Sequence, residues 1–272
     1  MQSTKPKIVF FTGAGVSQES GIQTFRDSKD GLWNNHKIED VATASAVTKD
    51  LNLVNQFYNE RRAQLHTVEP NLAHKLIADL ERTHDVTVIT QNVDNLHEKA
   101  GSTRVIHLHG ELNKVRSLLN PKLVYEWTKD VTDADRCESG ARLRPHIVFF
   151  QEMPMMIEEA VLALNEAETL VIIGTSFSIS YTEPLLTTYT NQEAIAVYID
   201  PQPVELNFVA NNIRKTATEG MRELFVDIHV SIMREQTFHM DDNQAREIVE
   251  NYLNENPILL DFNNKEYYLQ SV

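Results

Sequence analysis

The sequence predicts an α/β fold built on a doubly wound parallel sheet. Apolar runs of strand length recur along its 272 residues, and patterns of helical spacing lie between them. The runs are continuously apolar rather than alternating, which is typical of parallel strands that are covered on both faces. Alternation of such strands with helices favours the doubly wound arrangement. The runs are Ile8–Phe11, Val86–Ile89, Val105–Leu108, Ile147–Phe150, Leu170–Ile173 and Ala194–Ile199.

A glycine-rich turn follows the first run. Gly13 and Gly15 let the backbone approach a ligand closely, and a strand that leads through such a turn into a helix presents N–H groups to a phosphate. The third glycine of the usual dinucleotide pattern is replaced by Gln18, and no clear acidic ribose partner ends a second strand. The turn therefore predicts a nucleotide site of the Rossmann type, but not that of an ordinary dehydrogenase.

Helical spacing of apolar residues predicts helices between Leu72 and Leu80 and between Ile157 and Leu164. Two segments, residues 27–70 and 113–143, break the alternation of strands and helices. A C-terminal extension follows residue 230, with an amphipathic helix expected over residues 242–254.

Composition narrows the class of protein. The hydrophobic content of 42% suits a globular domain, and the formal net charge of -14 argues against binding to nucleic acid or to anionic membranes. The single cysteine, Cys137, excludes an internal disulfide and fits a reducing compartment. No apolar run reaches membrane-spanning length, and the first residues lack the apolar core of a signal peptide. We expect a cytoplasmic protein, whose oligomeric state the sequence leaves open.

Three further blocks identify a family. Thr90-Gln91-Asn92-Val93-Asp94-Asn95-Leu96-His97 and His107-Leu108-His109-Gly110-Glu111-Leu112 each follow a strand-like run, and Ile173-Gly174-Thr175-Ser176 ends another. Together with the first turn, these blocks resemble the sirtuins, the NAD-dependent protein lysine deacylases. The resemblance runs from about Lys7 to about Leu224 and is greatest to the short bacterial deacetylase and desuccinylase sirtuins. It implies a catalytic domain over residues 1–230, whose small domain is built from the insertions 27–70 and 113–143.

The resemblance assigns catalytic roles to His109, Asn92 and Asp94. His109 would deprotonate a ribose hydroxyl, Asn92 would order water and ribose, and Asp94 would accept a hydrogen bond from the nicotinamide amide. Taken alone, a lone histidine is more often structural, and these polar residues suit a turn and a helix cap. His107 is expected to point to the opposite face of the strand from His109.

The same resemblance predicts the remaining contacts to NAD. Phe25 would shield the reacting carbon, Arg26 would hold phosphate, and Gln91 would contact ribose hydroxyls. Gln23 stands where the family has proline. The cofactor-binding residues expected are Gly13, Ala14, Gly15, Ser17, Phe25, Arg26, Gln91, Asn92, Asp94, Gly174, Thr175, Ser176, Asp200 and Ala217.

The acylated lysine substrate is expected to meet two segments. Tyr58 and Arg61 lie three apart on a predicted helix, and in the desuccinylase subgroup such a pair binds the acyl carboxylate. On spacing alone they are two polar residues on a solvated face. The second segment holds Val148, Phe150 and Glu152 and resembles the part of sirtuins that pairs with substrate backbone. Two departures from the family are Gln151, which replaces a glycine, and Tyr181, which replaces a proline.

A structural zinc site is predicted to be absent. Most sirtuins hold zinc with four cysteines, and a structural site needs four ligands in tetrahedral array. This chain has Cys137 alone, and Ser117 stands near the place of a first cysteine. We expect apolar packing to stabilise the small domain instead. The candidates for that packing are Leu118, Leu119, Leu123, Val124, Tyr125 and Trp127.

Two other functions remain open at this point. An NAD glycohydrolase or mono-ADP-ribosyltransferase would use the same cofactor site without deacylation. A noncatalytic NAD-sensing or partner-binding module would use it without chemistry, but the presence of His109, Asn92 and Asp94 together argues against that alternative.

Overall fold

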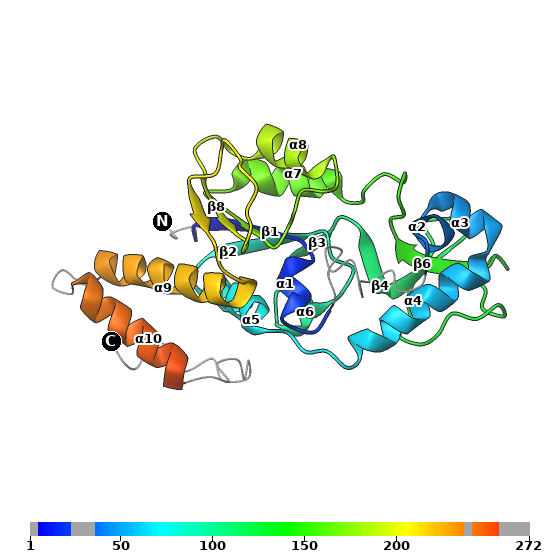
Figure 1. Cartoon of the computed structure of the whole chain (residues 1–272), viewed down its shortest axis with the longest axis horizontal. Coiled ribbons are helices and arrows are strands. Elements are labelled where there is room, and N and C mark those ends of the chain that lie inside the picture. The colour runs from blue at the N-terminus through cyan, green and yellow to red at the C-terminus, as the bar shows by residue number, and fades with distance from the viewer. Residues whose placement is uncertain (1–4, 23–35, 237–240, 256–272) are drawn as a thin grey trace.

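The computed structural model describes residues 5–22, 36–236 and 241–255 and has a parallel sheet at its centre (Figure 1). Six strands pair in the order β3-β2-β1-β7-β8-β9, and every pairing is parallel. The strands are β1 (Lys7–Thr12), β2 (Asp85–Thr90), β3 (Val105–His107), β7 (Thr169–Ile173), β8 (Ile195–Ile199) and β9 (Asn211–Ile213). Because the strand order reverses on either side of β1, the sheet is doubly wound, as expected.

Helices cover both faces of this sheet. Successive strand residues point to opposite faces, so Ile8 and Phe10 of β1 pack into one core cluster and Val9 and Phe11 into the other. This is why the strands read as continuous apolar runs. The first cluster is closed by α5 (Leu72–Asp79), α9 (Ala217–Gln236) and α10 (Asp242–Glu255), and the second by α7 (Ile157–Glu166) and α8 (Thr182–Tyr189).

A second, smaller body lies beyond the carboxyl ends of β2 and β3 (Figure 1). It contains an antiparallel sheet in the order β5-β4-β6 and the helices of the segment before residue 66. Its elements are α2 (Ile38–Val41), α3 (Ala44–Lys49), α4 (Leu51–Leu65), β4 (Gly110–Ser117), β5 (Val124–Glu126) and β6 (Leu143–Ile147). Short helical turns complete the described chain: α1 (Gly15–Gln18), η1 (Leu80–Arg82) and α6 (Leu96–Lys99).

The predicted strand Ile147–Phe150 is wrong in both place and partner. Strand β6 begins earlier, at Leu143, and pairs with β4 in the smaller sheet. The following residues form a connecting segment that makes one isolated bridge from Phe150 to Thr43. The edge strand β9 was missed because Asn211 and Asn212 are polar and exposed, so no apolar run marks it.

The packing predicted for the smaller body is partly wrong. Beside the cluster of α2, α3 and α4, a second core cluster consists of Val115, Val131, Cys137, Ala141 and Leu143, with Leu123, Tyr125 and Trp127 packed against it. Leu118, Leu119 and Val124 are exposed, and Leu119 has 80% of its surface accessible. Leu118 and Leu119 follow the end of β4, where the chain turns toward β5, so their side chains leave the sheet.

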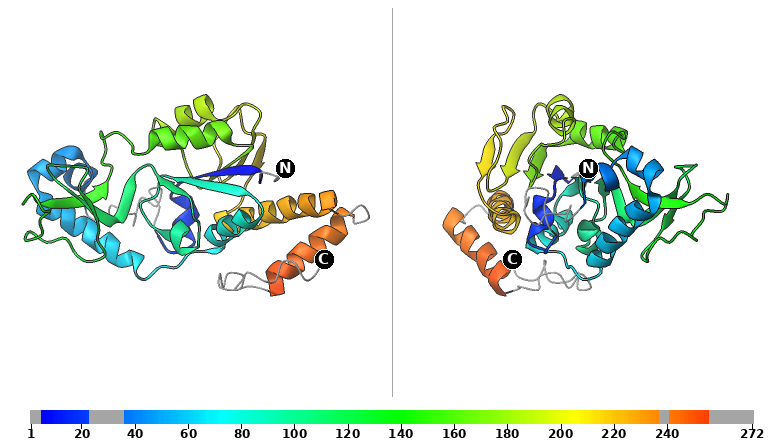
Figure 2. Two further views of the ribbon diagram at one scale, coloured as in Figure 1. Left: turned by 180° about the vertical axis from the view of Figure 1, so that it is seen from behind. Right: turned by 45° about the vertical axis from the view of Figure 1, so that its right-hand side comes forward.

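Helix α10 packs along α9 on the side of the molecule away from the smaller body (Figure 2). Its buried side chains are Ala245, Val249 and Leu253, whereas Ile248 is 47% exposed. An ion pair between Arg246 and Asp227 of α9 ties the two helices together. Within the described residues, no helix has both the length and the apolar character that crossing a membrane requires.

Candidate active site

The carboxyl ends of β1, β2 and β7 converge at the reversal point of the sheet, where ligands bind in doubly wound folds. The backbone after β1 lies directly against the backbone after β7. A Cβ atom on Gly13 would come within 2.7 Å of the Gly174 carbonyl oxygen, and one on Gly15 within 2.6 Å of the Gly174 Cα. Gly174 itself has a φ of +60°. Only glycine permits this approach.

The amide groups of the first turn are already engaged. The amides of Gly13 and Gly15 donate to the carbonyls of Ile173 and Gly174, both at 2.9 Å, and Ser17 donates to the Ala14 carbonyl at 3.1 Å. These bonds fix the turn against β7. The N–H groups of Gly13, Gly15 and Ser17, which the sequence suggested for binding a phosphate, therefore donate to backbone carbonyls instead.

A polar cluster joins the turn after β1 to the loop after β2. The side-chain amide of Asn92 donates to the Ser17 hydroxyl at 3.1 Å, and that hydroxyl donates to the Asp94 carboxylate at 3.0 Å. All three side chains are buried. Burial raises the pKa of Asp94, although hydrogen bonds from the Leu96 amide and Ser17 oppose the shift. The predicted residues are thus brought together, and Gln91 adds a bond of 2.9 Å to Thr175 at the end of β7.

His109 lies in the turn between β3 and β4, beside this cluster. Its Nδ1 is 2.7 Å from the Gln91 carbonyl oxygen, and its Nε2 is 2.7 Å from the Tyr181 hydroxyl. A carbonyl can only accept, so Nδ1 carries the proton of the neutral ring and Nε2 is the basic atom. Burial lowers the pKa of His109, which keeps the imidazole neutral near pH 7. The geometry suits a general base.

His107 lies beside the same loop, but its ring has a different partner beyond that loop. Its Nδ1 lies 3.2 Å from the Asn92 carbonyl, next to the carbonyl that His109 contacts. His107 also bonds Glu98 through Nε2 at 2.7 Å. The Nε2 atom of His109, by contrast, meets Tyr181 at the start of α8.

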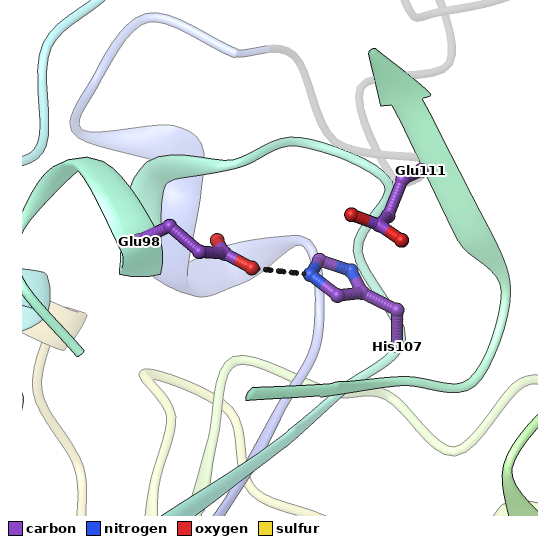
Figure 3. Close-up of side chains that lie close together, drawn as sticks. All are labelled: Glu98, His107 and Glu111. Carbon is purple, nitrogen blue, oxygen red and sulfur yellow. Dashed lines mark hydrogen bonds and ion pairs between the residues drawn. The ribbon is translucent and has the colours of Figure 1, made fainter. Parts of the chain in front are cut away.

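Glu98, His107 and Glu111 form a group with potential metal ligands, the one such group among the described residues (Figure 3). Each member already has a partner in the protein. Glu98 holds His107, and Glu111 pairs with Lys114 at 2.8 Å. The Glu98 carboxylate is thus paired with the imidazole of His107, and the Glu111 carboxylate with the ammonium group of Lys114. We therefore regard the group as an ion-pair cluster that fixes the Asn92 carbonyl.

Two buried histidines on the other side of the cluster were missed from the sequence. His74 Nε2 lies 3.4 Å from the Ser17 hydroxyl, and His97 Nε2 lies 3.1 Å from the Thr12 hydroxyl. The rings pack edge to face at 4.8 Å. Burial lowers the pKa of His74 to about 3 and that of His97 well below its usual value, so both rings stay neutral. His97 ends the block Thr90–His97, to which the family resemblance assigned a function without a role for this residue. His74 lies in the apolar helical pattern between Leu72 and Leu80, where no motif indicates a functional site.

The other predicted cofactor residues lie at the edges of this region. Ala14 belongs to the first turn, and the Ser176 hydroxyl bonds Ser178 at 2.6 Å. Asp200 follows β8, is buried, and accepts from the Gln202 amide at 2.8 Å. Ala217 is buried at the start of α9. Phe25 and Arg26 lie outside the described residues.

Tyr58 and Arg61 share one side of α4, next to the segment that follows β6. The Arg61 guanidinium stacks on the Phe57 ring at 3.2 Å and donates to the Phe57 carbonyl at 2.7 Å. Burial lowers its pKa to about 10, so it remains charged at neutral pH. Tyr58 is buried and packs against Phe149 at 5.6 Å, and burial raises the pKa of its hydroxyl.

The segment expected to pair with substrate is held by backbone and ionic contacts. The Val148 amide donates to the His109 carbonyl at 2.8 Å, and the Phe150 amide donates to the Ala42 carbonyl at 2.9 Å. Glu152 is ion-paired with Arg144 at 2.7 Å and with Arg116 at 3.1 Å. The Glu152 carboxylate thus holds the segment in place through its two ion pairs. The Phe150 side chain, by contrast, is 41% exposed.

Comparison with known proteins decides the family. The family model described as "Sir2 family" matches residues 13–181, which include the glycine turn, the Gln91–Asp94 loop and His109. The chain belongs to the Sir2 family. Sir2 relatives of high similarity include two bacterial proteins named NAD-dependent protein deacylase. The one from Helicobacter pylori is 45% identical over 219 residues, covering 80% of this chain and 95% of the relative. The one from Bacteroides thetaiotaomicron is 46% identical over 225 residues, with coverage of 80% and 95%.

A solved Sir2 structure has the same architecture. The crystal structure of a Sir2 homologue in complex with NAD is 36% identical to this chain, with a TM-score of 0.72. The similarity covers 82% of this chain and 90% of that protein. The main sheet with its smaller body is therefore the Sir2 fold.

The donor atoms around Cys137 in the smaller body fit Zn²⁺ poorly. Cys137 Sγ lies 3.3 Å from the Ser117 hydroxyl and 3.0 Å from the Ser139 hydroxyl. The Ser117 oxygen also accepts from the Leu119 and Asn120 amides, both at 3.3 Å. One thiol and two neutral hydroxyls are a poor donor set for Zn²⁺, which requires thiolate, imidazole or carboxylate ligands. A small hydrogen-bonded cluster stands in this place.

Proposed function

We propose that this chain is an NAD-dependent protein lysine deacylase that yields nicotinamide and O-acyl-ADP-ribose. Its relatives named NAD-dependent protein deacylase support the general activity. The observation that carries the proposal for this chain is the fixed tautomer of His109. Nε2 is the basic atom, and the ring is held by the Gln91 carbonyl, in the loop that also carries Asn92 and Asp94 of the buried polar cluster.

The residues at the carboxyl ends of β1, β2 and β7 fit NAD. The glycines at Gly13, Gly15 and Gly174 let two backbone turns meet without side chains between them. Gln91, Asn92 and Asp94 offer amides and a carboxylate for the nicotinamide ribose and the carboxamide. NAD supplies the ribose that accepts the acyl group when nicotinamide leaves. Asp200 and Ala217 are proposed to contact the adenosine half.

His109 is proposed as the general base. Its Nε2 takes the proton of a ribose hydroxyl, and the Gln91 carbonyl holds the ring through Nδ1 while it does so. The Gln91 carbonyl stabilises the resulting imidazolium, because it continues to accept from Nδ1–H. Burial around Asn92 and Asp94 excludes water and strengthens their interactions with the polar groups of the substrate.

Acidic acyl groups are proposed as substrates in addition to acetyl. Phe149, which contacts Tyr58, is the neighbour in sequence of Val148, whose amide bonds to the backbone of His109. This short chain of contacts supports a position for Tyr58 and Arg61 near the reacting centre. The charged Arg61 fork suits a succinyl or malonyl carboxylate. Val148 and Phe150 are proposed to receive the substrate backbone.

Two units are proposed for the chain. The catalytic domain spans residues 1–230, with its small domain drawn from 27–70 and 113–143, and residues 231–272 form an extension. Separate hydrophobic clusters in the main and smaller bodies support the small domain. The extension is not separate in packing, because α9 crosses residue 230 and Ala245, Val249 and Leu253 of α10 belong to the main cluster.

One experiment tests the function against its alternatives. Purified protein is incubated with NAD alone and with acetylated, succinylated or unmodified peptide, and all products are resolved by mass spectrometry. Deacylation with stoichiometric nicotinamide and O-acyl-ADP-ribose supports the proposal. Nicotinamide release without peptide indicates a glycohydrolase, a gain of mass on protein indicates ADP-ribosyl transfer, and no NAD consumption indicates a binding module.

A further inference from the structure

Both ring nitrogens of His109 have partners in the free protein. The bond from Nδ1 to the Gln91 carbonyl leaves Nε2 as the one basic atom, and the Tyr181 hydroxyl lies 2.7 Å from it. Burial raises the pKa of Tyr181, so its hydroxyl keeps its proton and donates to Nε2. The lone pair that a general base needs is therefore already occupied.

Tyr181 is one of the departures from the sirtuin pattern that the resemblance implies. Tyr181 replaces a residue that is proline in the sirtuin pattern, and proline has no hydroxyl. The shared chemistry therefore does not require the hydroxyl as a proton relay. In this chain it is an additional donor, which competes for Nε2 with the ribose hydroxyl.

The Tyr181 side chain packs against the cluster that α7 and α8 close, but it does not hold the start of α8. Tyr181 is the N-terminal capping residue of α8, and its side chain makes no capping hydrogen bond to that helix. The helix start is held instead by Thr182, whose hydroxyl donates to the Ile179 carbonyl at 2.7 Å. The Tyr181 ring meets the His109 ring edge to face, at 6.0 Å and 82°. Rotation of the Tyr181 side chain therefore breaks its bond to His109 without breaking those that start the helix.

We propose that Tyr181 masks His109 in the free protein and that the ribose hydroxyl of NAD must displace it. The proposal rests on the general-base role of His109 given above. It exchanges one hydrogen bond for another and involves no covalent step. A state that must open before it binds reduces the apparent affinity by the fraction that is open. Removing one neutral hydrogen bond should therefore tighten NAD binding by about two- to tenfold.

Tyr181→Phe tests the proposal, with Tyr189→Phe as a matched control. Tyr189 is an exposed tyrosine at the far end of the same helix. NAD binding is measured by calorimetry, and the steady-state constants are measured with acyl peptide. We expect Tyr181→Phe to lower both Kd and KM for NAD while kcat stays within about twofold, and Tyr189→Phe to match the parent. Unchanged NAD affinity in Tyr181→Phe overturns the masking, and a large fall in kcat shows instead that the hydroxyl relays the proton.

Nitrogen NMR of the histidine rings tests the contact in the unaltered protein. The His109 signals are assigned by their loss in His109→Ala. The Nε2 resonance should change when NAD binds, and in NAD-free Tyr181→Phe it should take the value of an unbonded lone pair. No difference between the parent and Tyr181→Phe overturns the proposal. If His109→Ala retains full deacylation, the proposed function fails. If His109→Ala is inactive and Tyr181→Phe binds NAD like the parent, only the masking fails.

Discussion

The hydroxyl of Ser17 lies 3.0 Å from the carboxylate of Asp94 and so connects the turn after β1 to the loop after β2. The same hydroxyl accepts a hydrogen bond of 3.1 Å from the side-chain amide of Asn92. One side chain thus orients both polar groups that are proposed to receive the nicotinamide ribose.

Ser17→Ala should lower kcat/KM for NAD by about tenfold or more, because a hydrogen bond to a charged group is worth roughly 1.5–3 kcal/mol. Steady-state kinetics at saturating acyl peptide measure the effect. Ser231→Ala, on the exposed side of α9, is the control and should leave the steady-state constants unchanged. Equal constants for Ser17→Ala and the parent would exclude a positioning role for Ser17.

His109→Ala should reduce deacylation by about a hundredfold or more, the usual loss for a general base. Because His109 lies in a turn rather than inside a core cluster, the fold and NAD binding should persist. Product formation is measured by mass spectrometry, and thermal unfolding and NAD calorimetry serve as controls. A variant with near-native rates would remove His109 from the mechanism.

Arg61→Met should impair succinyl-lysine and malonyl-lysine processing far more than acetyl-lysine processing. The loss of a charge-assisted hydrogen bond corresponds to about ten- to over a hundredfold in specificity, expressed mainly in KM. Arg62→Met is the contrasting variant. Arg62 is 1% exposed and donates to the Leu112 carbonyl at 2.7 Å, so its loss should lower stability and affect all substrates alike. If Arg61→Met lowers acetyl and succinyl rates equally, Arg61 serves the fold.

Metal analysis of protein purified without added zinc should show far less than one zinc per chain. The motivation is the Cys137, Ser117 and Ser139 cluster, whose donors do not suit Zn²⁺. The melting temperature should be the same with and without a strong chelator. Stoichiometric zinc whose removal unfolds the chain would contradict this expectation.

Glu98→Gln should destabilise the protein more in mild acid than in base. Burial alone would lower the pKa of His107, but the hydrogen bond and charge of Glu98 outweigh it, so the pKa is raised. A raised histidine pKa contributes stability that is fully present below the unfolded value of about 6.5 and is lost as pH rises through the folded value. Melting temperatures at about pH 5.5 and pH 9 measure this, and an equal deficit at both would refute it.

The sequence was sufficient for strands β1, β2, β3, β7 and β8 of the main sheet, and for the polar residues that lie near their carboxyl ends. Continuous apolar runs follow from burial on both faces, and the blocks around Gly13, Gln91 and His109 lie at strand ends that a parallel sheet must bring together. It was not sufficient for contacts between distant segments. Nothing local indicates that Tyr181 meets His109, or that Glu152 is neutralised by Arg144 and Arg116.

Strands that are short or polar could not be predicted from the sequence either. The edge strand β9 carries asparagines, and β6 begins with residues whose partners lie in β4, about thirty positions earlier. Long-range pairing of this kind depends on tertiary context rather than on local preference.

The contact between the glycine turns makes three positions interdependent. A side chain at Gly13, Gly15 or Gly174 would strike backbone rather than a flexible neighbour, so no change elsewhere in the turn can make room for it. Directed evolution of this chain toward another cofactor will therefore gain little from randomising these sites singly. Variation is better placed on the surrounding side chains, which can change shape while the two turns stay in contact.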